Sequence, residues 1–426
     1  MKTVVKELEY EKVLALPSEK AQNPVKPALF WRWLMKTLGN AELKSVNFKA
    51  NYFGMEILGK KEPCLVLMNH SCFMDLEIAE SVMYPRPLNI VCTSDGFVGK
   101  NWLMRQIGCI PTNKFVTDFM LVKNMKYALE TLKSSVLMYP EASYSFDGTA
   151  TPLPDTLGKC LKLLKVPVVM IRTYGAFAHD PLYNNLQKRK VDVSADVKYL
   201  LSPEEIDRKT VDELNEVLKN EFTFDNWKWQ QVNNVHITEP FRADYLNRVL
   251  YKCCNCGTEG RMLGKGTQLK CGECGAMWQL AENGFLEPQT SLKDSGRNFR
   301  HVPDWFSWQR EQVRVEIAAG TYRLDVPVEI YMMVNTKAIY HVGSGKLTHS
   351  EKGFVLDGCD GKLHYEQKPC ESYSLYSDYF WYEIGDMICI GNMKELYYCF
   401  PKSAGDIAAK ARIATEELYK LNKVCR

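Results

Sequence analysis

Two short segments of the sequence contain side chains whose types and spacing could do chemistry. In the first, "NHSCFMD", His70 is followed five residues later by Asp75. A neutral imidazole can take a proton from a hydroxyl group when a carboxylate fixes its tautomer and stabilises the imidazolium that forms. The spacing is too long for one face of a regular helix and suits a histidine in a loop ahead of a helix that begins near the aspartate. The alternative is a histidine bonded locally to the backbone.

The second segment, residues 253–278, contains two C-x-x-C pairs, each followed by glycine. The pairs are Cys253 with Cys256 and Cys271 with Cys274. Four thiolates in this pattern are typical of a tetrahedral Zn²⁺ ion with a closed shell, so the segment predicts a structural zinc ribbon. A metalloenzyme would require one ligand to be absent or displaced. Cys254 could replace Cys253, and because the flanks lack a dense basic patch, we do not expect nucleic-acid binding.

The residues around His70 belong to a region that alternates short apolar runs with helical patterns. The apolar runs lie at 64–68, 89–94, 135–139 and 166–171. This alternation predicts an α/β fold with a largely parallel sheet and flanking helices. Ligands bind outside the carboxyl ends of such strands. His70, Asp75 and Glu141 follow two of the runs, so they could converge at one edge of the sheet.

Four segments occur in an order that resembles the motif blocks of the glycerolipid acyltransferase family, the 1-acylglycerol-3-phosphate O-acyltransferases or lysophosphatidic-acid acyltransferases. They are "NHSCFMD" (69–75), "GCIPTNK" (108–114), "YPEASYS" (139–145) and "VPVVMI" (166–171), within roughly residues 25–245. The resemblance is to a bacterial type that carries a zinc ribbon. It implies phospholipid biosynthesis by transfer of a fatty acyl group from acyl-CoA or acyl carrier protein to a lysophospholipid hydroxyl, with 1-acylglycerol 3-phosphate as the default acceptor.

The resemblance also implies roles for individual residues. His70 corresponds to the general base that deprotonates the acceptor hydroxyl, and Asp75 to the residue that orients it. The residues matched to substrate binding are Asn69, Gly108, Lys114, Glu141, Ser143 and Pro167. Lys114 stands where the family commonly has an arginine for the acceptor's phosphate, and the third block lacks the family's arginine after Glu141, so a different hydroxyl-bearing lipid is an alternative acceptor. A catalytically inactive lipid-binding or scaffold protein is the alternative function.

Charge and hydropathy limit the partners and the location of the chain. Lys and Arg total 54 against 51 Asp and Glu, so no overall field favours nucleic acid. The first residues lack the apolar core of a signal peptide, and no apolar run approaches the roughly 18 residues of a membrane span, so we expect a cytoplasmic protein. Residues 25–40 predict an amphipathic helix that either packs on the core or docks on the inner face of the membrane. Its apolar face contains Phe30, Trp33, Leu34 and Leu38.

Beyond residue 301 the pattern changes to short alternating strands, the first of them expected at "QVRVEI" (312–317). A final helix follows, with Ser403 and Asp406 as its expected cap. The sequence therefore predicts an acyltransferase domain over 1–246, a zinc-ribbon module over 247–300 and a β-rich domain over 301–426. The last resembles a pleckstrin-homology-like barrel with a terminal helix.

Overall fold

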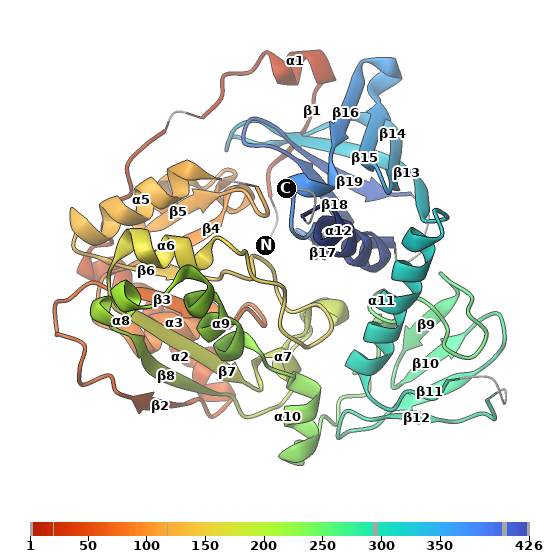
Figure 1. The fold of residues 1–426 in the computed structure, drawn as a ribbon, viewed down its shortest axis with the longest axis horizontal. Coiled ribbons are helices and arrows are strands. Elements are labelled where there is room, and N and C mark those ends of the chain that lie inside the picture. The colour runs from red at the N-terminus through yellow and green to blue at the C-terminus, as the bar shows by residue number, and fades with distance from the viewer. Residues whose placement is uncertain (1–2, 20, 117, 293–296, 403–406, 424–426) are drawn as a thin grey trace.

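The structure, a computed structural model, describes residues 3–19, 21–116, 118–292, 297–402 and 407–423. Three β-sheets organise these residues (Figure 1). They follow one another along the chain, except that β1 (Val5–Glu7), near the start, pairs with a strand of the last sheet.

The first sheet has seven strands and carries the residues expected to do chemistry. All neighbouring strands are parallel except β7 and β8, which are antiparallel. This confirms the predicted α/β fold with a largely parallel sheet. In spatial order the strands are β2 (Lys49–Phe53), β8 (Ser194–Leu201), β7 (Val168–Tyr174), β3 (Leu65–Met68), β6 (Ser135–Met138), β4 (Leu88–Thr93) and β5 (Cys109–Thr112).

Helices cover both faces of this sheet, as its strands require, because β3 and β6 are buried throughout. On one face, Val66 and Met68 pack with α2 (Leu29–Ser45) and α3 (Asp75–Met83). On the other face, Leu65 and Leu67 pack with α5 (Phe119–Glu130), α6 (Leu157–Leu164), α8 (Pro203–Arg208) and α9 (Val211–Phe222). The remaining helices before the second sheet are α1 (Tyr10–Leu14), α4 (Asn101–Gln106), α7 (Ala176–His179) and α10 (Asn226–Val232).

The second sheet is a small antiparallel sheet that begins within the cysteine-rich segment. Its order is β12 (Leu286–Pro288), β11 (Met277–Leu280), β10 (Gln268–Cys271) and β9 (Met262–Lys265). Trp278 of β11 is fully buried against Trp305 of the following helix, α11 (Val302–Ala318), with ring centroids 4.8 Å apart. This aromatic contact fixes the small sheet to the rest of the molecule.

The helix α11 corrects the prediction of a strand at 312–317. In a strand, Val313, Val315 and Ile317 would share one face, but Val315 is 62% exposed while the other two are buried. The buried positions instead recur every three or four residues, as a helix requires. They are Val302, Pro303, Trp305, Phe306, Gln309, Val313 and Ile317. Local alternation therefore misled the prediction, and the longer helical period determined the structure.

The third sheet joins two antiparallel meanders through the β13–β19 pair and is followed by α12 (Ile407–Lys423), which confirms a β-rich region with a terminal helix. The expected cap, Ser403 with Asp406, lies outside the described residues. The strand path is β16 (Leu363–Gln367), β15 (Gly353–Gly358), β14 (Ile339–Ser350), β13 (Arg323–Met333), β19 (Leu396–Pro401), β18 (Gly385–Gly391) and β17 (Tyr376–Trp381).

Candidate active site

His70 and Glu141 follow neighbouring parallel strands, β3 and β6, and meet at the carboxyl edge of the first sheet. The backbone N–H of His70 donates a hydrogen bond to Glu141 Oε2 at 2.8 Å. Asp75 is the first residue of α3, which begins just beyond the same edge. The structure therefore brings together the three residues that the strand pattern placed at one edge of the sheet.

Asp75 holds the loop that carries His70. Its buried Oδ2 lies 3.0 Å from His70 Nδ1 and accepts hydrogen bonds from the backbone N–H groups of Ser71 at 2.6 Å and Cys72 at 3.0 Å. A carboxylate at a helix N-terminus is also stabilised by the helix dipole. When Nδ1 donates to this carboxylate, the neutral ring keeps its lone pair on Nε2, which is the arrangement a general base needs.

Aromatic rings enclose the imidazole of His70. Tyr139 stacks on it with centroids 4.0 Å apart, and Tyr144 lies 4.3 Å away at a steeper angle. Burial is the largest influence on the pKa of His70 and lowers it below the usual value, although the hydrogen bond with Asp75 acts in the opposite direction. The ring is therefore neutral near pH 7. Its side chain is still 19% exposed, so a hydroxyl group has access to it.

Residues 139–151, the 139–151 loop, hold the backbone of His70 from both sides. Glu141 is buried, and it accepts from the N–H of His70 through Oε2 and from the N–H of Thr151 through Oε1 at 2.7 Å. The N–H of Ser145 donates to the carbonyl of His70 at 2.7 Å. Burial raises the pKa of Glu141 to about 7, while the two backbone donors lower it. The loop thus fixes the position of His70 as well as the environment of its ring.

Asn69 connects the histidine loop to β7. Its Oδ1 accepts from the N–H of Thr173 at 2.8 Å, and its Nδ2 donates to the hydroxyl groups of Ser71 at 3.0 Å and Thr173 at 3.1 Å. All three residues are buried. These contacts fill the hydrogen-bonding capacity of the amide with protein partners, so Asn69 holds the loop in place.

Lys114 follows β5 at the same edge of the sheet and faces the third sheet. Its Nζ lies 4.2 Å from the ring centroid of Tyr376, and its charge is one of the influences that lower the pKa of His70. It also lines a cavity of about 720 Å³ whose other walls include Gln367, Ser372 and Tyr376. A cation is therefore present near His70, beside a cavity formed with the carboxyl-terminal part of the chain.

Gly108 and Pro167 lie at the opposite edge, because they precede β5 and β7 rather than follow them. Gly108 has φ +89°, and a Cβ there would approach the carbonyl of Leu88 and the ring of Pro27 to 3.0 Å. The carbonyl of Pro167 accepts from the N–H of Leu65 at 2.9 Å. Both residues shape the start of a strand, so we do not assign them to the site.

Several residues that hold the site were missed in the sequence. Thr151 and Thr173 contact Glu141 and Asn69, but isolated threonines carry no signal of such a role. Arg412 of α12 donates from Nη2 to the hydroxyl of Ser143 at 3.1 Å, so Ser143 has a protein partner far along the chain. The two tyrosines around His70 flank Glu141 in "YPEASY", and this pair of aromatic residues could have indicated ring packing.

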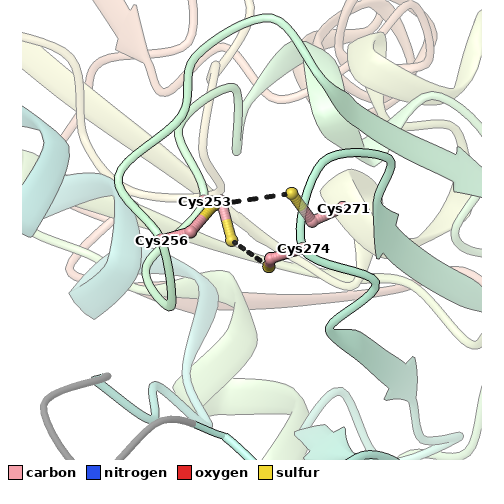
Figure 2. A group of neighbouring side chains, drawn as sticks. All are labelled: Cys253, Cys256, Cys271 and Cys274. Atoms are coloured by element: carbon pink, nitrogen blue, oxygen red, sulfur yellow. Dashed lines mark hydrogen bonds between the residues drawn. The ribbon is translucent and has the colours of Figure 1, made fainter.

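The four predicted metal ligands form a separate group (Figure 2). One sulfur from each of Cys253, Cys256, Cys271 and Cys274 lies within 4.8 Å of all the others. The Cys253–Cys274 and Cys256–Cys271 sulfur pairs are each 3.8 Å apart. A tetrahedron of thiolates about 2.3 Å from zinc has edges of about 3.8 Å, so the donor set fits this ion. Cys254 points elsewhere, because its thiol donates to the carbonyl of Arg297 at 3.1 Å. The group can therefore hold a metal ion through the two predicted pairs.

Part of the apolar surface of α2 is exposed. Gly39 and Leu43 are buried toward α3, whereas Phe30 is 58% and Trp33 51% exposed. Trp102 of α4 is 68% exposed, and its ring lies 6.0 Å from that of Trp31. One helix thus both packs on the core and exposes aromatic residues.

In the part of the chain that the structure describes, we find no helix with the length and apolarity needed to cross a membrane.

Comparison with known proteins finds one family model that covers the region of His70. Residues 49–173 match the family model "Acyltransferase". A solved structure, the 1-acyl-sn-glycerophosphate (LPA) acyltransferase PlsC from Thermotoga maritima, is 18% identical to this chain, covers 45% of this chain and 78% of its own, and has a TM-score of 0.34. No curated protein matches the chain. The matched residues 49–173 include His70, Asp75, Lys114 and Glu141.

Proposed function

We propose that this chain transfers a fatty acyl group from acyl-CoA or acyl carrier protein to the hydroxyl of a lysophospholipid. The match of residues 49–173 to the family model "Acyltransferase" supports this proposal. The default acceptor is 1-acylglycerol 3-phosphate. One observation carries this proposal: Asp75 holds Nδ1 of the enclosed His70 at 3.0 Å. This leaves Nε2 as the base for an acceptor hydroxyl.

The proposed reaction needs no covalent enzyme intermediate. Nε2 of His70 takes the proton of the acceptor hydroxyl as its oxygen attacks the thioester carbonyl, and the C–S bond then breaks. The proton passes from the imidazolium to the departing thiolate, which leaves as a thiol. Asp75 stabilises the imidazolium while it exists. Glu141 and Asn69 hold the loops that position His70, and Lys114 supplies a cation for an anionic group on the acceptor, without the two-pronged geometry of an arginine.

We further propose that the exposed aromatic residues of α2 and α4 dock the protein on a membrane surface, where lysophospholipids reside. Trp33 and Trp102 are more than half exposed, and aromatic rings are favourable at the boundary between lipid headgroups and acyl chains. Arg32 and Lys36 of the same helix instead contact the turn after α3, through the carbonyl of Pro85 and the ring of Tyr84, so the exposed surface is mainly aromatic. The protein would therefore be peripheral to the membrane.

Zn²⁺ is the metal we propose for the four-cysteine group. When bound, it would supply structural cross-linking rather than catalysis, because four thiolates leave no open coordination position. The N–H groups of Gly257 and Gly275, which donate to the carbonyls of Cys253 and Cys271, close the two turns that direct the sulfurs inward. We propose that these turns and the second sheet form a zinc ribbon between the acyltransferase region and the third sheet.

The test is acyl transfer by the purified full-length protein. Labelled acyl-CoA, and separately acyl carrier protein, are incubated with a panel of lysolipids in vesicles, and labelled diacyl product is measured. We expect His70→Ala to reduce the rate by about 10²–10⁴, as loss of a general base predicts. His236→Ala, which removes an exposed histidine, should behave like the native protein. Absence of product with every acceptor and both donors would instead indicate a lipid-binding or scaffold protein on the same fold.

A further inference from the structure

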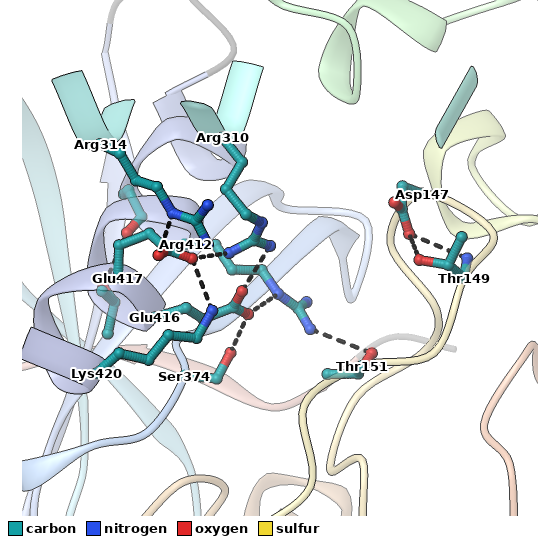
Figure 3. A network of polar contacts seen from close by, with 12 residues as sticks. Asp147, Thr149, Thr151, Arg310, Arg314, Ser374, Arg412, Glu416, Glu417 and Lys420 are labelled. Atoms are coloured by element: carbon teal, nitrogen blue, oxygen red, sulfur yellow. Dashed lines mark hydrogen bonds and ion pairs between the residues drawn. The ribbon is translucent and has the colours of Figure 1, made fainter. Parts of the chain in front are cut away.

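A buried network of charges joins α11 to α12 (Figure 3). Arg310 of α11 lies 2.7 Å from Glu416 and 2.8 Å from Glu417 of α12. Arg412, also on α12, places Nε 3.3 Å from Glu416. Arg412 and Glu416 are almost fully buried. Charges taken out of water are costly unless their partners are well placed, and here each one has an opposite charge within contact distance.

Arg412 differs from Arg310, and from Arg314, which pairs with Glu417, because it also reaches the acyltransferase region. Its Nη2 donates to the hydroxyl of Ser143 at 3.1 Å and to that of Thr151 at 3.4 Å. Its guanidinium lies 5.0 Å from the ring centroid of Phe146. Ser143, Phe146 and Thr151 all belong to the 139–151 loop. Figure 3 shows Arg412 pointing from α12 toward Thr151, whereas Arg310 and Arg314 remain among the helix carboxylates.

The loop that Arg412 contacts is the one that holds His70. Thr151 and His70 donate their backbone N–H groups to the two oxygens of Glu141, and Ser145 donates to the carbonyl of His70. A displacement of the loop would therefore move the imidazole relative to the acceptor hydroxyl. Misplacement of about 1 Å can cost about 10²-fold in rate, since the reacting atoms must be aligned.

We propose that Arg412 is a positioning residue for His70, so that the terminal helix α12 is part of the acyl-transfer machinery. The inference rests on the proposed function and adds a role for a region outside residues 49–173. A planar guanidinium can bind Glu416 on one side and the loop hydroxyls on the other at the same time. An ammonium group has no such fork, so lysine would keep the charge without the geometry.

The charge of Arg412 also acts on Glu141, which gives the proposal a second readout. The titratable and charged groups facing Glu141 are His70, Asp75, Tyr373 and Arg412. Burial raises the pKa of Glu141 to about 7, and Arg412 lowers it. Glu141 accepts two N–H donors best as a carboxylate. Removal of the cation therefore moves the acidic limb of the rate profile to higher pH, and a lysine leaves that limb in place.

The experiment compares Arg412→Met and Arg412→Lys with a loop variant, Ser143→Ala/Thr151→Val. The loop variant removes the two hydroxyl acceptors but leaves the helix network and the Thr151 N–H intact. We expect all three variants to lower kcat about 10–100-fold with little change in KM. Only Arg412→Met should shift the acidic limb of the rate profile to higher pH. Arg314→Met is the matched control, because Arg314 pairs with Glu417 and Glu311 without touching the loop. It should keep the native kcat.

Three further measurements separate this inference from the proposed function and from unfolding. The NMR titration of the His70 imidazole and the hydrogen exchange of the 139–151 loop need no substrate, and both should change in Arg412→Met and in the loop variant, but not in Arg314→Met. Thermal unfolding shows whether each variant is folded at the assay temperature. A native His70 titration and native loop exchange in the folded loop variant would overturn the proposal, whether or not the native protein transfers acyl groups.

Discussion

The His70 site and the four-cysteine site are both marked by short motifs, but they are held together in different ways. The four cysteines lie within residues 253–274, and hydrogen-bonded turns at Gly257 and Gly275 direct their sulfurs. His70 has Asp75 nearby in sequence, but it also depends on Glu141 after another strand, and the adjacent Asn69 is held by Thr173 of β7. The difference shows that a metal cluster can be specified by its own segment, whereas a site at a sheet edge requires the whole fold.

The largest effect should follow loss of the cysteine group. Zinc binding contributes about 10–16 kcal/mol to folding in small zinc modules, so we expect Cys271→Ser, or treatment with a chelator, to abolish zinc binding and the hydrogen-exchange protection of β9–β12. Cys254→Ser is the control and should retain zinc. Metal analysis measures the zinc content, and hydrogen exchange measures the protection of β9–β12. If Cys254→Ser lost zinc and Cys271→Ser kept it, the assignment of the ligands would be wrong.

A substitution of Asp75 should impair the His70 site and leave the four-cysteine site intact. Asp75→Asn should lower kcat by about 10²–10⁴, because an amide does not balance the charge of the imidazolium and does not fix the tautomer of His70. The zinc content should stay native. Glu80→Gln alters another buried carboxyl group of α3 and is the matched control. Comparable turnover for Asp75→Asn and the native protein would contradict the role given to Asp75.

The smallest effect should come from residues that belong to neither site. Trp33→Ala with Trp102→Ala should weaken binding to phospholipid vesicles by about 1 kcal/mol per ring, since each ring is already partly buried in the protein and loses only the burial of its exposed part. Zinc content and turnover on a water-dispersed short-chain acceptor should not change. Vesicle co-sedimentation measures binding, with Val315→Ala as an exposed control on α11. Undiminished sedimentation of the double variant would rule out this docking surface.

Much of the fold and of both sites follows from local patterns in the sequence. The parallel sheet, the meeting of His70 with Asp75 and Glu141, and the pairing of the four cysteines depend on local patterns, and the structure contains all of them. In an α/β region the loops that follow parallel strands lie at the same edge of the sheet. The proximity of residues 70 and 141 could therefore be predicted from the strand pattern.

Other features could not be predicted, because they depend on packing between distant segments that no sequence pattern connects. The contact of Arg412 with Ser143 joins two residues far apart in the chain, and a lone arginine on a helix gives no sign of its partner. Gly108 and Pro167 were grouped with the site because their motifs were, although their place before the strands puts them at the other edge. The strand expected at 312–317 failed because a short window shows alternation where a longer one shows a helix.

The pairing of β1 with β14 has a consequence for the order in which the molecule is built. Val5 lies beside Ile339, so among the described strands β1 gains its partner only after β14 has been synthesised. Contacts between such distant residues form late, because closing so long a loop costs entropy before it gains any contact. The strands of the α/β region pair over shorter separations, the longest being between β2 and β8, so they can pair earlier. The β1–β14 pair should therefore form after the sheet of the α/β region.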